Sequence, residues 1–183
     1  MTIQSADPFW CAALQGCETD LALWLRNHSS LTLSIQKRCK DFAVRGVRTD
    51  LARIALDESM LLQIAPQQLA YSREVFLYAD EKPVVFAHST FAYKNLRGAW
   101  KAVRSLDSKP LGAMLFTHPL VKRRPLHYKL LRSVHPLYKR AVSILDDPPQ
   151  RLWARRSLFY LHGEPLLVTE VFLPGIVQLN MCK

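Results

Sequence analysis

Several common catalytic signatures are missing from this 183-residue chain. It contains no HExxH zinc motif, no GxSxG nucleophile motif and no GxxxxGK[ST] phosphate loop, so hydrolase and nucleotide-binding functions have no motif support. Its four cysteines form no CxxC pair, and no histidine accompanies them at metal-ligand spacing. These absences predict free thiols in a reducing cytosol and no metal site.

Long hydrophobic runs are also missing. No apolar stretch approaches the roughly 18 residues that a membrane-spanning helix requires, and residues 1–6 lack the basic region of a signal peptide. We therefore expect a cytoplasmic protein. At 183 residues and 49% hydrophobic, the chain fits one domain, residues 1–183, with a sizeable core.

Acidic residues are scarce relative to basic ones. The 15 Asp and Glu against 25 Lys and Arg give a net charge of +10, which favours an anionic partner. Residues 118–145 contain seven Lys and Arg and no acid, and we interpret them as a solvated, positively charged flank. No nucleic-acid-binding motif accompanies this run, so no nucleic-acid partner is expected. Weak association with an anionic membrane surface is a second use for the same charge.

Two segments share one pattern. Residues 73–86 (REVFLYADEKPVVF) and 156–168 (RSLFYLHGEPLLV) each contain an apolar strand, a short polar turn and a second strand, which predicts two β-hairpins. Apolar spacing predicts helices over residues 8–27, 33–40 and 96–106. The hydroxyls of residues 29–32 are placed to cap the second of these helices.

Glu170 interrupts the apolar, β-branched run 166–174 (LLVTEVFLP). Strand alternation places it on the same face as Val168 and Phe172, and both faces of the strand read as covered. A buried carboxylate requires a partner, and Arg73 has the right sign. One interpretation is a pocket carboxylate that serves as a proton donor or binds a ligand hydroxyl. The other is a structural ion pair across the sheet.

Arg73 shares strand parity with Val75 and Leu77. An arginine that points inward can hold a carboxylate through two parallel hydrogen bonds. Alternatively, its stem covers an edge strand while its head stays in water. An inward Arg73 together with an inward Glu170 predicts a pocket for a small anion.

The turn Pro110-Leu111-Gly112 is a weaker candidate. Glycine permits close approach and proline fixes the preceding geometry, so this turn can present a backbone N–H to an anion. A loop that only closes packed elements would have the same sequence.

The combined order of four segments resembles the chorismate lyase family. These segments are residues 24–32 (WLRNHSSLT), 73–83 (REVFLYADEKP), 109–117 (KPLGAMLFT) and 152–174 (LWARRSLFYLHGEPLLVTEVFLP). The resemblance implies an α+β fold: a single domain with an antiparallel β-sheet, flanked by helices, that encloses the ligand. It also implies a monomer that cleaves chorismate to 4-hydroxybenzoate and pyruvate, the first step of ubiquinone biosynthesis, with no metal or organic cofactor.

The same resemblance assigns roles to four residues. Arg73 matches the arginine that holds the aromatic carboxylate, and Glu170 matches the glutamate that meets the ring hydroxyl; both are candidate catalytic residues. Leu31 and Leu111 match positions whose backbone N–H groups contact the ligand, although Leu31 replaces a methionine of the family. The sealed pocket implies slow release of product.

The main alternative is a non-catalytic domain of the same fold that senses a small aromatic acid, as in the effector domains of some bacterial transcription regulators. Such regulators carry a DNA-binding helix-turn-helix in front of this domain. The residues before Arg73 contain no convincing recognition helix, so we favour the enzyme.

Overall fold

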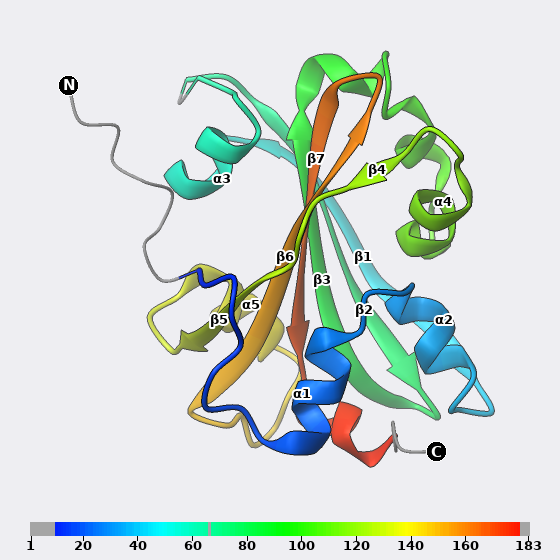
Figure 1. Ribbon diagram of the computed structural model, residues 1–183, viewed down its shortest axis with the longest axis vertical. Coiled ribbons are helices and arrows are strands. Elements are labelled where there is room, and N and C mark those ends of the chain that lie inside the picture. The colour runs from blue at the N-terminus through cyan, green and yellow to red at the C-terminus, as the bar shows by residue number, and fades with distance from the viewer. Residues whose placement is uncertain (1–9, 66, 180–183) are drawn as a thin grey trace.

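The two predicted hairpins form the centre of the sheet. The computed structural model describes residues 10–65 and 67–179 (Figure 1). In it, the first hairpin is β2 (Ala70–Ala79) with β3 (Lys82–Ala92), and the second is β6 (Arg151–Leu161) with β7 (Glu164–Phe172). The sheet has the order β1-β2-β3-β7-β6-β4, in which β1 is Phe42–Ala52 and β4 is Lys122–Arg123. A further strand, β5 (His127–Arg132), also pairs with β6, and every pairing is antiparallel. The predicted α+β class with an antiparallel sheet is confirmed.

Tight turns explain why both hairpins form. Asp80 and Glu81 have φ of 47° and 65°, and His162 and Gly163 have φ of 52° and 81°. Two successive residues with positive φ match the twist of the strands they connect. Each turn therefore aligns the apolar residues of its two strands on common faces.

The edge strand β1 (Phe42–Ala52) contains a bulge. Its register against β2 shifts between Arg45 and Arg48. Gly46 lies in this bulge with φ of 62°, a conformation that glycine adopts without strain. The bulge therefore interrupts the pairing of an otherwise extended strand.

The predicted N-terminal helix over residues 8–27 is wrong for most of its described part. The helix α1 covers only Thr19–Arg26, and residues 8 and 9 lie outside the described range. Upstream of α1, Cys11 and Tyr128 exchange two backbone hydrogen bonds of 2.9 and 2.8 Å. Trp10 packs with residues of the sheet and of α5 (Pro136–Ala141), so its apolar side chain serves tertiary packing and does not belong to a helical pattern.

The other helices are short. The helix predicted over residues 33–40 begins and ends earlier, as α2 (Leu31–Gln36), and the one predicted over 96–106 is replaced by two 3-10 helices, η1 (Tyr93–Leu96) and η2 (Lys101–Ser105). The remaining helices are α3 (Leu56–Leu61), α4 (Leu111–Thr117), α5 (Pro136–Ala141) and η3 (Pro174–Gln178). No helix in the described residues is long and apolar enough to cross a membrane.

The basic segment 118–145 is not simply a solvated flank. It forms β4 (Lys122–Arg123), β5 (His127–Arg132) and α5, and it buries Tyr128, Leu131 and Tyr138. Its Lys and Arg residues alternate with these buried residues, so its charge alone did not indicate that the segment contributes to the core. This part of the sequence interpretation is wrong.

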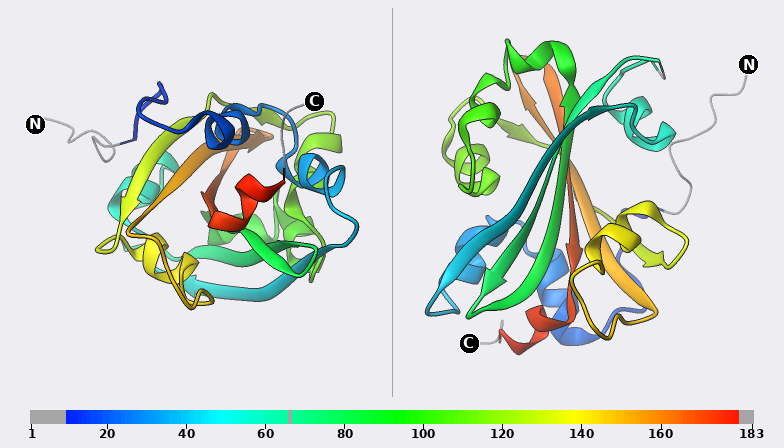
Figure 2. Two further views of the ribbon diagram at one scale, coloured as in Figure 1. Left: turned by 90° about the horizontal axis from the view of Figure 1, so that it is seen from below. Right: turned by 180° about the vertical axis from the view of Figure 1, so that it is seen from behind.

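Strand alternation gives the sheet two different faces. On one face, Val75 and Leu77 pack with α1 and α2; on the other, Phe76 packs with α5. The strands curl toward the first face, and α1, α2 and α4 cover it (Figure 2). Arg73 belongs to this covered, concave face, which holds the site.

Candidate active site

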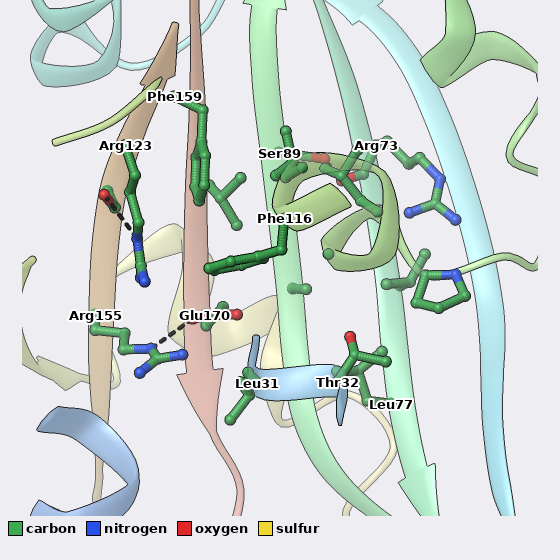
Figure 3. A pocket seen from close by; sticks show the side chains of 18 residues that line it. Leu31, Thr32, Arg73, Leu77, Ser89, Phe116, Arg123, Arg155, Phe159 and Glu170 are labelled. Carbon is green, nitrogen blue, oxygen red and sulfur yellow. Dashed lines mark hydrogen bonds and ion pairs between the residues drawn. The ribbon is translucent and has the colours of Figure 1, made fainter. Parts of the chain in front are cut away.

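A pocket lies between the concave face of the sheet and the first turns of α2 and α4 (Figure 3). All four residues singled out from the sequence line it: Leu31, Arg73, Leu111 and Glu170. Its walls are mainly apolar and come from β2, β3, α4, β6 and β7; they are formed by Val75, Leu77, Ala87, Leu115, Phe116, Phe159 and Val168. Such a surface suits a small, flat and largely apolar ligand.

Arg73 is buried, with only 3% of its surface exposed, because β2 lies between β1 and β3. The edge-strand alternative is therefore wrong. Its Nη2 donates hydrogen bonds to the carbonyl oxygens of Asp107 (2.8 Å) and Lys109 (3.0 Å), in the loop that leads into α4. Burial lowers the pKa of its guanidinium. Within the described residues no carboxylate forms an ion pair with Arg73, so its charge is available to a ligand.

Glu170 forms its ion pair with Arg155 and not with Arg73, which corrects the predicted partner. Arg155 is the register partner of Glu170 on the adjacent strand β6, and its Nε lies 2.5 Å from Glu170 Oε2. The strand β3 separates Arg73 from β7 in the sheet order. The ion pair and the pocket position coexist, so the two interpretations of Glu170 are not exclusive.

Arg155 was missed in the sequence analysis. It is 1% exposed, and its Nη1 donates to the carbonyl oxygens of Trp24 (3.1 Å), Leu25 (3.2 Å) and Asn27 (2.6 Å) at the end of α1. These bonds fix the side chain that holds Glu170. An arginine in the middle of an apolar strand was the available signal, and it is the same signal that identified Arg73.

Arg123 is a second cation that the sequence analysis missed. It projects from β4 into the pocket, where its guanidinium carbon lies 5.4 Å from the ring centroids of both Phe116 and Phe159. Its Nε donates to Ser157 Oγ (3.3 Å) and its Nη1 to the carbonyl oxygen of His28 (2.7 Å). Burial, and then repulsion by Arg155, lower its pKa. No local pattern distinguishes Arg123 from the cations on either side of it in the chain.

Leu31 and Leu111 are the first residues of α2 and α4. Ser30 caps α2, since its Oγ accepts a hydrogen bond from the N–H of Leu33 (3.4 Å). The N–H groups of Leu31 and Leu111 have no acceptor in the part of the chain that the structure describes. Unpaired N–H groups at the start of a helix favour an anionic or carbonyl oxygen nearby.

Gly112 lets the two helices approach one another. A Cβ at this position would lie 3.2 Å from Thr32 Oγ1 and 3.4 Å from Ser30 Oγ, which is tighter than ordinary contact. The first turns of α2 and α4 therefore pack closely where they border the pocket. A larger residue at position 112 would separate them.

The charged groups of the pocket are three arginines and one glutamate, an excess of two positive charges. Across the described residues, no group of three or more His, Cys, Asp and Glu is placed to hold a metal ion. The arrangement can hold an anion at Arg73 and offer a carboxylate oxygen to a hydroxyl at Glu170. The arrangement can therefore accommodate a small carboxylic acid that also carries a hydroxyl.

Solved structures share this architecture of a curled sheet with a helix-covered face. The C-terminal domain of a histidine utilization repressor from Pseudomonas syringae pv. tomato matches with a TM-score of 0.53 at 10% identity, over 78% of this chain and 96% of that one. The effector domain of PhnF from Mycobacterium smegmatis matches with a TM-score of 0.51 at 12% identity, over 81% and 90%. At these identities the likeness shows the fold alone, an antiparallel sheet in an α+β domain.

Sequence relatives define the family. The profile of chorismate lyase matches residues 9–180. A protein named probable chorismate pyruvate-lyase from Nitrosospira multiformis is 52% identical over 157 residues, 85% of this chain and 87% of the relative. One of the same name from Nitrosomonas europaea is 46% identical over 170 residues, 93% and 96%. The chain belongs to the chorismate lyase family, as its sequence resemblance predicted.

Proposed function

We propose that the protein is a chorismate pyruvate-lyase, which converts chorismate to 4-hydroxybenzoate and pyruvate. The observation that carries the proposal is the position of Arg73 and Glu170 on opposite sides of one mainly apolar pocket (Figure 3). Family membership and the names of the relatives support the same substrate. A flat acid with a hydroxyl para to its carboxylate fits between a cation and a carboxylate.

The reaction requires little chemistry from the protein. The bond between ring carbon C3 and the enolpyruvyl oxygen breaks, and C4, which bears the hydroxyl, loses its hydrogen as a proton. The electron pair left by that proton completes the aromatic ring, and a proton adds to the enolpyruvyl methylene to give pyruvate. Because aromatisation drives the reaction, the pocket contributes mainly by positioning the substrate and stabilising charge at the departing oxygen.

Arg73 binds the ring carboxylate in this proposal. Its charge is not neutralised by a carboxylate among the described residues, and two carbonyl oxygens hold its Nη2 in place. A fixed guanidinium orients a carboxylate with little loss of entropy on binding. The backbone N–H groups of Leu31 and Leu111 add donors at the helix ends that border the same pocket.

Glu170 binds the ring hydroxyl. Its Oε2 contacts Arg155, whereas Oε1 has no partner among residues 10–65 and 67–179. An ion-paired carboxylate with one free oxygen accepts a hydrogen bond from a hydroxyl. The same oxygen is placed to assist proton transfer at the carbon that bears the hydroxyl.

We further propose that this lyase acts as a cytoplasmic monomer, needs no metal or organic cofactor, and supplies 4-hydroxybenzoate as the first step of ubiquinone biosynthesis. The self-driven aromatisation supports independence from a cofactor. The excess of basic residues supports weak association with an anionic membrane surface.

The test is to incubate the purified protein with chorismate in the presence of a metal chelator. Loss of chorismate absorbance, the appearance of 4-hydroxybenzoate and stoichiometric pyruvate, detected with lactate dehydrogenase and NADH, are the expected results. A sensing domain, the alternative that the fold neighbours represent, would bind the aromatic acid without releasing pyruvate. Loss of activity with chelator that returns on metal addition would contradict independence from a metal.

A further inference from the structure

One pocket arginine, Arg123, takes no part in binding the ring carboxylate or the ring hydroxyl. Arg73 faces the ring carboxylate, and Arg155 is neutralised by Glu170. We propose that Arg123 holds the carboxylate of the enolpyruvyl side chain, the group that the aromatic product lacks. This inference rests on the proposed function and adds a residue that distinguishes substrate from product.

The charges of site and substrate support the assignment. The pocket carries three arginines and one glutamate, which leaves two cations without a counter-ion among the described residues. Chorismate carries two carboxylates, one on the ring and one on the enolpyruvyl group. Each unpaired arginine can therefore bind one carboxylate, whereas 4-hydroxybenzoate would leave one of the two cations unpaired.

The substitution pattern of the ring indicates which cation binds which carboxylate. The hydroxyl on C4 lies opposite the carboxylate on C1, and the enolpyruvyl ether is on C3, next to the hydroxyl. With Arg73 at C1 and Glu170 at C4, the enolpyruvyl group must extend near Glu170. Arg123 and Arg155 lie on the Glu170 side of the pocket, across from Arg73 (Figure 3). Of these two, only Arg123 lacks a carboxylate partner among the described residues.

Arg123 is held in a fixed orientation. Phe116 and Phe159 lie beside its guanidinium, Ser157 accepts from Nε, and the backbone of His28 accepts from Nη1. Its Nη2 has no partner within the described chain, which leaves one terminal nitrogen free to donate to a ligand. A guanidinium fixed in this way costs little entropy when it binds a carboxylate.

In this arrangement the ring carboxylate stays on the aromatic product after cleavage, whereas the carboxylate bound by Arg123 leaves with pyruvate. Before cleavage, the enolpyruvyl carboxylate offsets the repulsion between Arg123 and Arg155. After cleavage, the carboxylate belongs to pyruvate, and Arg123 has no covalently attached partner in the aromatic product. Arg123 should therefore contribute to binding and turnover of chorismate but not to retention of 4-hydroxybenzoate.

The test compares Arg123→Met with Arg124→Met. Methionine keeps an unbranched apolar side chain between the two phenylalanines, and Arg124 is the adjacent, exposed arginine, which contacts Tyr160 outside the pocket. For Arg123→Met we expect kcat/KM with chorismate to fall at least about twentyfold, while Kd for 4-hydroxybenzoate changes at most about threefold. Arg124→Met should match the wild type in both, and Arg73→Ala should weaken both.

Wild-type kinetics in Arg123→Met, or equal losses for substrate and product, would overturn the inference. If Arg123→Met does not fold, as judged by circular dichroism, Arg123→Lys decides instead, because lysine retains the charge. A reduced kcat/KM with unchanged product affinity in that variant supports the proposal, and equal losses refute it. If the wild-type protein itself neither cleaves nor binds chorismate, the proposed function fails, which is a separate result.

Discussion

Arg155 and Glu170 face each other across β6 and β7, with Nε of the arginine 2.5 Å from Oε2 of the glutamate. Arg155 is almost completely buried, and its remaining bonds go to the backbone at the end of α1. Arg155 therefore holds one carboxylate oxygen of Glu170, and the other oxygen has no partner among the described residues.

Glu170→Gln should fold but lose most lyase activity. Glutamine keeps the shape and an acceptor oxygen for Arg155, whose three backbone bonds remain, but it removes the charge and the capacity to take a proton. We expect kcat with chorismate to fall by at least about a hundredfold, the usual contribution of a positioned acid or base. Glu164→Gln, on the same strand but outside this pocket, is the control. Wild-type turnover in Glu170→Gln would make the carboxylate purely structural.

Arg73→Ala should reduce kcat/KM at least tenfold, because loss of one partner from a buried charge pair costs about 2 to 5 kcal/mol. The cation that holds the ring carboxylate would be gone, together with the two bonds to the loop before α4. Arg151→Ala removes an exposed arginine of β6 and should leave the kinetics unchanged. Steady-state assays with chorismate measure both, and a variant indistinguishable from wild type would exclude Arg73 from the mechanism.

Closure of the pocket by α2 and α4 predicts inhibition by the product. Gly112→Val would place a branched side chain against Thr32 and Ser30, separate the two helices and so weaken retention of 4-hydroxybenzoate. We expect the Kd for 4-hydroxybenzoate to rise at least about tenfold. Stopped-flow experiments should show faster dissociation of the product.

Gly98→Val provides the matched glycine control. A Cβ at Gly98 would meet no atom closer than 3.7 Å, so product affinity should not change. If the product dissociates from Gly112→Val as slowly as from the wild type, contact between the two helices does not limit release.

The strands could be predicted well from the sequence because side chains alternate between the two faces of a strand with a period of two, which is a local property of each segment. Both hairpins follow from alternating apolar residues and short turns, and the same alternation placed Arg73 and Glu170 on inward faces. The N-terminal helix failed because Trp10 is apolar for a distant reason, its packing against the sheet and α5. Between the two 3-10 helices that replace the helix predicted over residues 96–106, Trp100 is likewise tied to a distant strand, since its Nε1 donates to the carbonyl oxygen of Glu164 (3.2 Å).

The pocket could be predicted only in part. Which arginine neutralises Glu170 depends on the order of the strands, because β6 is its neighbour and β2 is not. Arg123 enters the pocket because the short strand β4 pairs with β6 and places it beside Ser157. These are long-range pairings, and neither the charge nor the periodicity of a single segment encodes them.

A buried ionic cluster lies on the face of the sheet opposite the pocket. His88 on β3 contacts Glu74 on β2 through Nδ1 (3.0 Å) and Glu58 on α3 through Nε2 (3.3 Å), and Arg140 on α5 contacts Glu74 (2.8 Å). His88 is 4% exposed and Glu58 is 8% exposed. The cluster connects the sheet to both helices that cover this face.

The protonation states of this cluster are mutually dependent. Burial opposes the charge on His88, but its contacts with the two carboxylates outweigh burial, and Arg140 weakens them only in part, so that the pKa of His88 is raised. Burial likewise opposes ionisation of Glu58 and Glu74, yet contact with His88 lowers the pKa of both carboxyl groups. Folding therefore favours the charged form of all three groups relative to the unfolded chain.

The cluster predicts a window of pH in which it stabilises the fold. The stabilisation by His88 is complete below the pKa of an unfolded histidine, about 6.5, and is lost as pH rises through the higher folded value. The stabilisation by Glu58 and Glu74 is complete above the pKa of an unfolded glutamate, about 4.3, and is lost as pH falls through the lower folded values. The full contribution therefore spans about pH 4.3 to 6.5, and only the part from His88 declines on the alkaline side.

His88→Gln should therefore destabilise the protein most at about pH 5 to 6.5, by about 3 kcal/mol, because it leaves two buried carboxylates with Arg140 as their main cation. The difference in free energy of unfolding from the wild type should shrink as pH rises above about 6.5, the pKa of an unfolded histidine, and as pH falls below about 4.3, the pKa of an unfolded glutamate. Urea unfolding across this pH range measures the difference. For the control His162→Asn, in the exposed turn of the second hairpin, the difference in free energy of unfolding should not vary with pH. A destabilisation by His88→Gln that did not vary with pH would mean that the histidine stabilises the fold as a neutral, packed ring.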